Sequence, residues 1–203
     1  MWAADPQAEI VEPAVRADLY GVPERDGKEP LMKRFVLFFA VVMNLVLADA
    51  VTKEIAEHLL VSGDSFSVIP GFFDLSLVHN RGCAWGLFQG RVWPLALFGI
   101  LALGVLVWQR RKVFSFENVK HLHFLCIHGS FFRVSEPLLY AGILGNVIDR
   151  IFRGYVVDML DFHWKNVYHY PCFNLADVYI CVAAGMLVLA SFLEKRDVGE
   201  EHT

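Results

Sequence analysis

Four apolar stretches of helical length constrain this chain more than any other feature of its sequence. They lie at residues 35–51, 92–108, 131–148 and 173–193. A helix needs about 20 mainly apolar residues to cross the hydrocarbon core of a bilayer. With 56% hydrophobic and only 20% charged residues, the composition is typical of membrane proteins rather than of soluble domains. We therefore expect a mainly α membrane protein with four transmembrane helices.

The third stretch is less regular than the other three. Arg133, Glu136 and Pro137 interrupt the apolar sequence between Leu122 and Ile148. Proline and charged residues are unfavourable inside a membrane helix, so an uninterrupted apolar run begins only at Leu138. We place the third helix, with these interruptions included, at about residues 131–148.

Basic residues lie at the ends of apolar stretches that share one side of the membrane if four spans alternate. They are Lys33-Arg34, Arg110-Arg111-Lys112 and Lys195-Arg196. The positive-inside rule then places both termini in the cytoplasm. The outer segments are residues 52–90 and 149–171, and polar and apolar residues alternate over 72–78, which predicts a small extracytoplasmic β-containing segment between helices 1 and 2.

Residues 1–32 are polar and contain four prolines, and they lack the short apolar run and cleavage site of a secretory signal. We interpret them as a cytoplasmic N-terminal extension, followed by a four-span membrane domain at 33–196 and a short cytoplasmic tail at 197–203. The net charge of −4 and the absence of a long basic cluster argue against a nucleic-acid partner. The four cysteines lack the paired spacing of a metal site or a disulfide framework.

Four carboxylates are expected at the outer level of the membrane: Asp49, Asp149, Asp158 and Asp177. Ionisable groups at a bilayer edge are costly and are functional candidates by default. Asp49 and Asp149 could equally flank helix ends. Asp158 is expected in the loop after helix 3, where the preceding apolar residues would keep it poorly solvated, and Asp177 shares a helical face with Asn174.

Asp158 and Asp177 are plausible partners in hydrolysis. Two carboxylates within hydrogen-bond reach cannot easily both ionise, so the pair titrates as a unit with one member protonated. The ionised member can draw a proton from water while the neutral member polarises a carbonyl group. That division of roles is the one that peptide hydrolysis needs.

Five short motifs follow in chain order: Asp49-Ala50-Val51-Thr52-Lys53, Asn80-Arg81-Gly82-Cys83-Ala84-Trp85-Gly86, Ala141-Gly142-Ile143-Leu144-Gly145-Asn146-Val147-Ile148-Asp149-Arg150, Val156-Val157-Asp158 and Phe173-Asn174-Leu175-Ala176-Asp177. In this order on a four-span chain they resemble the lipoprotein signal peptidases, or type II signal peptidases, a family of membrane aspartyl proteases. The resemblance covers about residues 33–196. Cys83, Trp85 and Ala141 depart from the family pattern, which leaves the shape of the pocket wall open.

The resemblance implies a catalytic pair, Asp158 and Asp177. It implies that substrate and pair are oriented by Asn80, Asn146, Arg150 and Asn174. Gly142, four residues before Asn146, would let substrate pass close to the helix, although close helix packing is the alternative for Gly142 and Gly145. Arg150 could instead form a structural pair with Asp149. Asp49 and Lys53 lie four residues apart and could pair at the end of a helix. We expect structural roles for Asp49, Lys53 and Asp149.

The same resemblance implies the reaction and its setting. The substrate would be a prolipoprotein, cut just before a cysteine that carries a diacylglyceryl group. The enzyme would lie in the bacterial cytoplasmic (inner) membrane beside membrane lipid, as a monomer with its active site near the outer face. No metal or organic cofactor is implied.

Two other classes of protein compete with this interpretation. His79, His163 and His169 are expected near the carboxylates and could bind zinc in a metalloprotease, but no His-Glu-x-x-His spacing occurs. A transporter or proton-relay protein also carries intramembrane carboxylates, but it would be expected to place them near mid-membrane. A non-enzymatic membrane scaffold is a third possibility.

Overall fold

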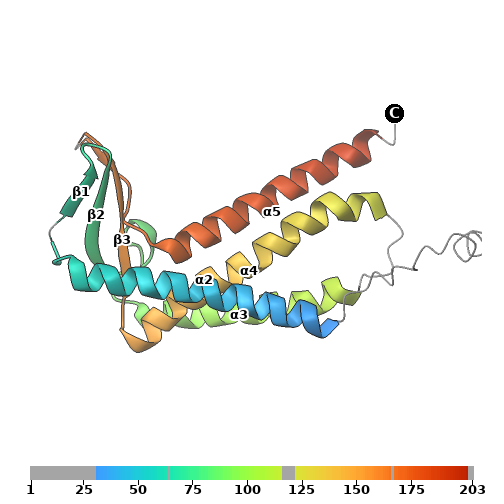
Figure 1. Ribbon diagram of the computed structural model, residues 1–203, viewed down its shortest axis with the longest axis horizontal. Helices are drawn as coiled ribbons and strands as arrows, with labels where there is room; N and C mark the ends of the chain where they lie inside the picture. Colours follow the sequence, from blue (N-terminus) through green and yellow to red (C-terminus); the bar gives the residue numbers. More distant parts are fainter. Residues whose placement is uncertain (1–30, 64, 116–121, 166, 201–203) are drawn as a thin grey trace, which may run out of the picture. The chain divides into compact units, whose positions relative to one another are not determined.

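The computed structural model describes residues 31–63, 65–115, 122–165 and 167–200 (Figure 1). Its contacts divide the chain into two units, Met1–Leu37 and Phe38–Thr203, and every contact discussed below lies within the second. Residues 1–30 of the predicted N-terminal extension lie outside the described residues. The long helices of the described chain are α2 (Leu31–Leu59), α3 (Val92–Ser115), α4 (Leu122–Phe152) and α5 (Leu175–Glu200).

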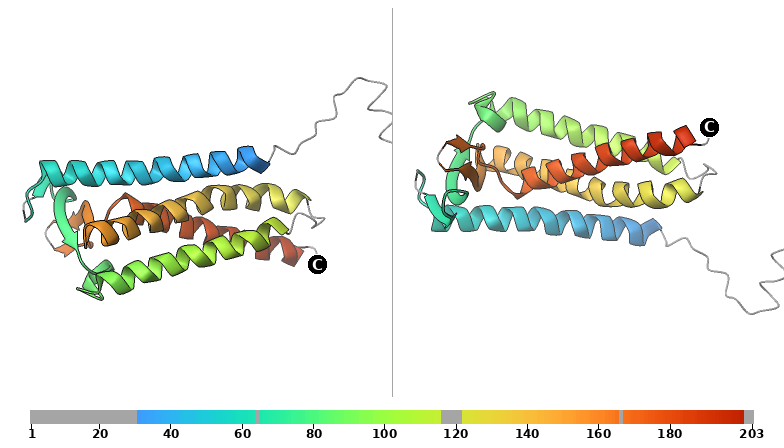
Figure 2. Two further views of the ribbon diagram at one scale, coloured as in Figure 1. Left: turned by 90° about the horizontal axis from the view of Figure 1, so that it is seen from below. Right: turned by 90° about the horizontal axis from the view of Figure 1, so that it is seen from above.

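Helix α4 is the centre of the helical packing. It packs against both α3 and α5, as the two views of Figure 2 show. Its contact with α2 is formed by Val42, Val46 and Ala141, which make up a buried cluster. The ring of Phe38 meets that of Tyr140 edge to face, with centroids 5.4 Å apart. Ala141, one of the departures from the family pattern, is thus fully buried between helices.

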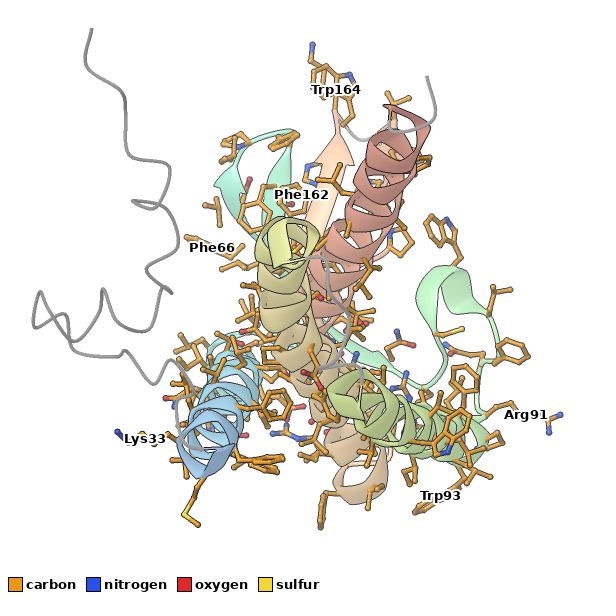
Figure 3. The ribbon with its side chains drawn as sticks, turned by 90° about the vertical axis from the view of Figure 1, so that its right-hand side faces the viewer. Lys33, Phe66, Arg91, Trp93, Phe162 and Trp164 are labelled. Carbon is orange, nitrogen blue, oxygen red and sulfur yellow. The ribbon has the colours of Figure 1, made fainter. Side chains whose placement is uncertain are left out.

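The outward surfaces of the helices are apolar. Of the described helices, Phe35–Leu59 is long and apolar enough to cross a membrane, whereas Val92–Trp108 and Leu175–Ala190 are shorter apolar helices. Large side chains are exposed along α3 and α5, including Phe98 at 71% and Phe192 at 63%. Arg91 and Trp93 at the start of α3 point away from the other helices (Figure 3), as side chains at a membrane–water interface commonly do.

A small antiparallel sheet lies beside one end of the helices (Figure 1). Its strands are β1 (Ser65–Ile69), β2 (Phe73–Asn80), β3 (Val156–Trp164) and β4 (Tyr168–His169), in the order β1-β2-β3-β4. The strand expected from the alternation over residues 72–78 is confirmed by β2. The sheet is not confined to the segment between α2 and α3, however, because β3 and β4 come from the connection between α4 and α5.

The prediction that Asp158 lies in a loop was therefore wrong: it lies on β3 and pairs with Val78 of β2. Period-two alternation reveals a strand only when one face is solvated. Val156, Val157, Asp158 and Met159 are all buried, so β3 carries no such signal.

The predicted start of the third helix, at about residue 131, was also wrong. Helix α4 begins at Leu122 and continues through Pro137. The helix thus includes residues 122–130, whose His, Gly and Ser residues interrupt the apolar pattern but not the helix. Pro137 lay inside the predicted helix, and a proline need not end a helix that neighbouring elements support. Here Ser135 and Pro137 are both buried, which indicates that this part of α4 is held by protein contacts.

Close approach of α4 to α5 depends on glycine at position 142. A Cβ atom added there would lie 2.5 Å from the backbone oxygen of Ala176 and 2.7 Å from the side chain of Ile180. A backbone atom cannot move aside cheaply, so any larger residue would push the helices apart. Gly145 is similarly tight, with an added Cβ 2.6 Å from Asp49 Oδ2.

We expect Gly142→Ala to lower the stability of the fold by about 1–3 kcal/mol, the usual effect of overpacking. Gly104→Ala is the matched control, because nothing lies within 4 Å of its added Cβ and alanine favours helix. Thermal unfolding of both variants in one detergent measures the effect. Equal stability of the two variants would contradict the packing role.

Candidate active site

Asp158 is a buried carboxylate held by two amide donors. Its exposed fraction is 2%. Asn80 Nδ2 on β2 donates to Oδ2 at 2.9 Å, and Asn174 Nδ2 donates to Oδ1 at 2.7 Å. Asn80 is itself fixed by the Gly82 backbone N–H, which donates to its Oδ1 at 2.9 Å. The carboxylate therefore has a defined orientation between the sheet and the start of α5.

Asp177 is held at the first turn of α5 by a reciprocal capping arrangement. The Asp177 backbone N–H donates to Asn174 Oδ1 at 3.0 Å, and the Asn174 N–H donates to Asp177 Oδ2 at 3.3 Å. This is the geometry of a capping box, in which residues three apart satisfy each other's free donors. The other oxygen, Oδ1, accepts a 2.8 Å hydrogen bond from Asn146 Nδ2 of α4.

Asn174 links the two carboxylates because it caps the helix of Asp177 and donates to Asp158. Both carboxylates line one cavity of about 610 Å³. Burial and, to a smaller extent, the nearby charge of Asp177 raise the pKa of Asp158 to about 7, against the opposing effect of the amide hydrogen bonds. The cavity thus holds a carboxylate that takes up a proton near neutral pH beside a second carboxylate.

A buried ion network lies next to this pair of carboxylates. Lys53 Nζ is 2.7 Å from Asp49 Oδ2 and 2.8 Å from Asp149 Oδ2. It also donates to Asn146 Oδ1 at 3.3 Å. Asp49 Oδ1 accepts the Ala176 backbone N–H at 2.9 Å. The network joins α2, α4 and the first turn of α5, and Asn146 connects it directly to Asp177.

Arg150 forms part of the cavity wall and contacts two backbone carbonyls. It donates to the Gly82 oxygen at 3.0 Å and to the Asn146 oxygen at 3.2 Å. The first contact ties the segment after β2 to α4. Gly142, by contrast, lies against α5 and is not among the residues that line the cavity.

Apolar side chains that the sequence analysis did not single out form the remaining wall. They are Val156, Phe162, Tyr170, Pro171, Cys172, Phe173, Val178, Ile180 and Cys181. The edge of Tyr170 contacts Trp85, with ring centroids 5.4 Å apart, so the two outer segments meet through aromatic rings. For residues 170–173, the position just before α5 was a signal that the sequence analysis could have used. Which side chains face a cavity, however, depends on tertiary packing.

The histidines considered for a metalloprotease do not form one group. His79 Nε2 lies 3.1 Å from Glu57 Oε1, and its ring packs on Tyr155. His163 and His169 stack on each other elsewhere on the sheet, and none of the three lines the cavity.

Comparison with known proteins agrees with this geometry. The model of the family described as Signal peptidase (SPase) II matches residues 41–193. A lipoprotein signal peptidase of Clostridium acetobutylicum is 36% identical over 152 residues, which cover 75% of this chain and 90% of that protein. One from Bacillus pumilus is 30% identical over 171 residues, covering 83% and 100%. A bacterial membrane enzyme solved by the in meso method at 2.3 Å has a TM-score of 0.64 and 31% identity, covering 79% and 90%.

The fold that the chain shares with a bacterial membrane enzyme, together with the match to the signal peptidase model, identifies the chain as a membrane protease. The chain belongs to the signal peptidase II family. The family resemblance drawn from the five motifs is thereby confirmed.

Lys53→Met should destabilise the protein by about 3–5 kcal/mol, because it leaves two buried carboxylates without their shared cation. Thermal unfolding in detergent measures this. Glu54→Gln is the control one residue along α2, since it removes an exposed contact with Arg153 and should leave the unfolding temperature unchanged. Similar unfolding temperatures for both variants would contradict a structural role for Lys53.

The raised pKa of Asp158 predicts a stability that falls as pH rises. Between the ordinary pKa of 3.8 and the folded value of about 7, the folded protein binds more protons than the unfolded chain. The stability that the folded protein gains from the protonated Asp158 is therefore fully present below pH 3.8. It decreases as the pH rises from 3.8 to about 7, and the stability does not change further above pH 7 through this group.

Asp158→Asn lacks this titration, so its stability relative to the parent should increase by a few kcal/mol between pH 4 and pH 8. Chemical unfolding of both proteins across that range measures the difference. A difference in stability that does not vary with pH would show that the pKa of Asp158 is not raised in the folded protein.

Proposed function

We propose that Asp158 and Asp177 are the catalytic pair with which this chain removes the signal peptide from diacylglyceryl-modified prolipoproteins. Membership of the signal peptidase II family supports the reaction class. The observation that carries the assignment of residues is that Asn174 contacts both carboxylates at one cavity. Its side-chain amide donates to Asp158, and its backbone N–H donates to Asp177. Neither carboxylate is paired with a cation in the contacts that the described residues make, so both are free to act on substrate.

The chemistry divides between the two carboxylates. Burial favours Asp158 as the residue that holds the shared proton near neutral pH, and Asp177 is the general base. Asp177 takes a proton from a water molecule as the water oxygen attacks the scissile carbonyl carbon, while Asp158 gives its proton to the carbonyl oxygen. Asp177 then gives the proton it took from water to the amide nitrogen, the C–N bond breaks, and a hydroxyl group of the tetrahedral intermediate returns a proton to Asp158. The products are the carboxylate of the signal peptide and the free amine of the lipidated cysteine.

Asn80, Asn146, Asn174 and Arg150 orient the pair and the substrate in this proposal. The three amides fix the carboxylate oxygens through the hydrogen bonds described above. Arg150, at the wall of the cavity, retains N–H groups that can meet a peptide carbonyl. Asp49, Lys53 and Asp149 act structurally, and the tight contact of Gly142 with α5 favours packing over substrate binding for that residue.

The setting follows from the distribution of apolar surface. We propose that α2, α3, α4 and α5 all cross the bacterial cytoplasmic membrane, with both termini in the cytoplasm, and that the sheet and cavity lie near the outer face. The exposed apolar side chains of the helices support this arrangement, as does the location of Asp158 on β3 and of Asp177 in the first turn of α5. Lipid chains of the substrate could then stay in the bilayer while its peptide reaches the pair.

Cleavage of a synthetic prolipoprotein peptide by the purified protein in detergent tests the proposal. Asp158→Asn and Asp177→Asn should each lower kcat by at least about 10³-fold, because either change removes a proton-transfer group. Glu54→Gln, whose side chain lies outside the cavity, should retain parental kcat. A matched peptide whose cysteine lacks the diacylglyceryl group should be cleaved much more slowly.

Parallel unfolding measurements separate lost chemistry from lost folding. Near-parental kcat in a folded Asp158→Asn or Asp177→Asn variant would remove that residue from the catalytic pair. Equal cleavage of the two peptides would contradict the lipidated substrate class.

A further inference from the structure

A second group of reactive side chains lies on the sheet, away from the cavity lining. It consists of Asp161 and His163 on β3 and His169 on β4, and one potential ligand atom of each lies within 4.8 Å of the others. The imidazole rings of His163 and His169 are stacked, with centroids 5.0 Å apart and an interplanar angle of 22°. Nothing in the peptidase chemistry described above uses these residues.

The backbone of the sheet brings these side chains onto one face. Asp161 and His163 are two residues apart on one strand, which places them on the same side. His169 is the direct partner of His163 across the β3–β4 pair, and Asp74 is the partner of Asp161 across the β2–β3 pair. Three strands thus contribute to one cluster, whose positions are fixed by the register of the sheet.

Two carboxylates face each other at this cluster, and the polar contacts of Asp161 are long. Its Oδ1 lies 3.7 Å from His169 Nδ1, and its Oδ2 accepts a hydrogen bond from Ser76 Oγ at 3.4 Å. Asp74 and Asp161 are opposed on neighbouring strands, and like charges directly opposite destabilise a sheet. Asp74 Oδ1 is buried and has no hydrogen-bond partner within the described chain. The nearest basic contact of Asp74 is His163 Nε2, 4.0 Å from its Oδ2.

His163 gives an independent indication that a ligand is needed here. Its exposed fraction is 6%, and among the described residues its Nδ1 finds no hydrogen-bond partner. An unpaired buried polar atom lowers the stability of the folded protein. A buried imidazole with one unpartnered nitrogen, in a ring that lies within 4.8 Å of potential ligand atoms of His169 and Asp161, is the arrangement expected of a metal ligand.

We propose that Asp161, His163 and His169 bind a divalent transition-metal ion of the zinc class. Two imidazole nitrogens and one carboxylate oxygen suit Zn²⁺, Ni²⁺ or Cu²⁺ better than Ca²⁺ or Mg²⁺, which prefer oxygen ligands. Tetrahedral zinc with bonds of about 2.0–2.1 Å holds its ligand atoms about 3.4 Å apart. Rotation of the exposed His169 ring can close the remaining gap, and Asp74 or water completes the coordination.

The bound ion would stabilise the wall of the active-site cavity rather than act on the peptide bond. Tyr170 directly follows His169, and its backbone N–H donates to the Phe162 carbonyl at 2.8 Å. Both Tyr170 and Phe162 line the cavity, whereas none of the three metal ligands does. The ion would join β3 and β4 immediately beside these two wall residues.

Isothermal titration of Zn²⁺ into the full chain, purified without a histidine tag and stripped with a chelator, tests the proposal. We expect one ion to bind per chain. His169→Gln and Asp161→Asn should each weaken binding about tenfold or more, and both residues are accessible enough for substitution without loss of the fold. His58→Gln is the control, since His58 is an exposed histidine on α2 paired with Glu54, and it should bind like the parent.

Cobalt substitution gives a second readout that does not depend on enzymatic activity. Co²⁺ held by these ligands should give visible absorption bands in the parent and in His58→Gln but not in His169→Gln. The proposal is overturned if the parent fails to bind Zn²⁺ at micromolar concentration. It is also overturned if His169→Gln and Asp161→Asn bind as tightly as the parent. Because binding is measured without substrate, either result leaves the proposed peptidase function unaffected.

Discussion

The buried cation of Lys53 is the interaction on which the rest of the structure depends. It is enclosed by Asp49 of its own helix and by Asp149 of α4. A charge in such a place is tolerated only when its partners are close and their remaining hydrogen-bonding groups are satisfied. Asp49 meets that condition by accepting the Ala176 backbone N–H, so the ion network also positions the first turn of α5.

The side-chain amide of Asn146 connects this ion network to the candidate active site. Asn146 accepts from Lys53 with its oxygen and donates to Asp177 with its nitrogen. Its location on the central helix explains how residues far apart in the sequence can hold one carboxylate in place. Hydrogen bonds therefore connect the ion network of Lys53 to the proposed catalytic pair, Asp158 and Asp177. A residue that does not contact substrate can still determine the geometry of this pair.

The sheet serves two separate purposes. Asp158 on β3 faces the cavity, and its burial is an energetic cost that the amides of Asn80 and Asn174 only partly offset. Farther along the same strand, Asp161 and His163 belong to the proposed metal site. The two sets are distinguished by their partners: neutral amides contact the carboxylate that is proposed to exchange protons, whereas imidazoles lie beside the carboxylate that is proposed to hold an ion.

Much of this was determined by the sequence alone. Apolar stretches predicted the helices because a bilayer requires long apolar segments, and the five motifs indicated the family because their residues and order are specific. The spacing of Asp49 and Lys53 anticipated their ion pair, since residues four apart meet on one helical face. The apolar residues before Asp158 correctly indicated a poorly solvated carboxylate.

Only the tertiary structure decided how these parts meet. Strand β3 carries no alternation because both of its faces are covered, and α4 passes through Pro137 because surrounding protein supports it. The double role of Asn174, as helix cap and as donor to Asp158, requires β3 to approach the start of α5. Likewise, His163 and His169 become neighbours through strand register. Such relations arise from long-range packing, which no local pattern of residues encodes.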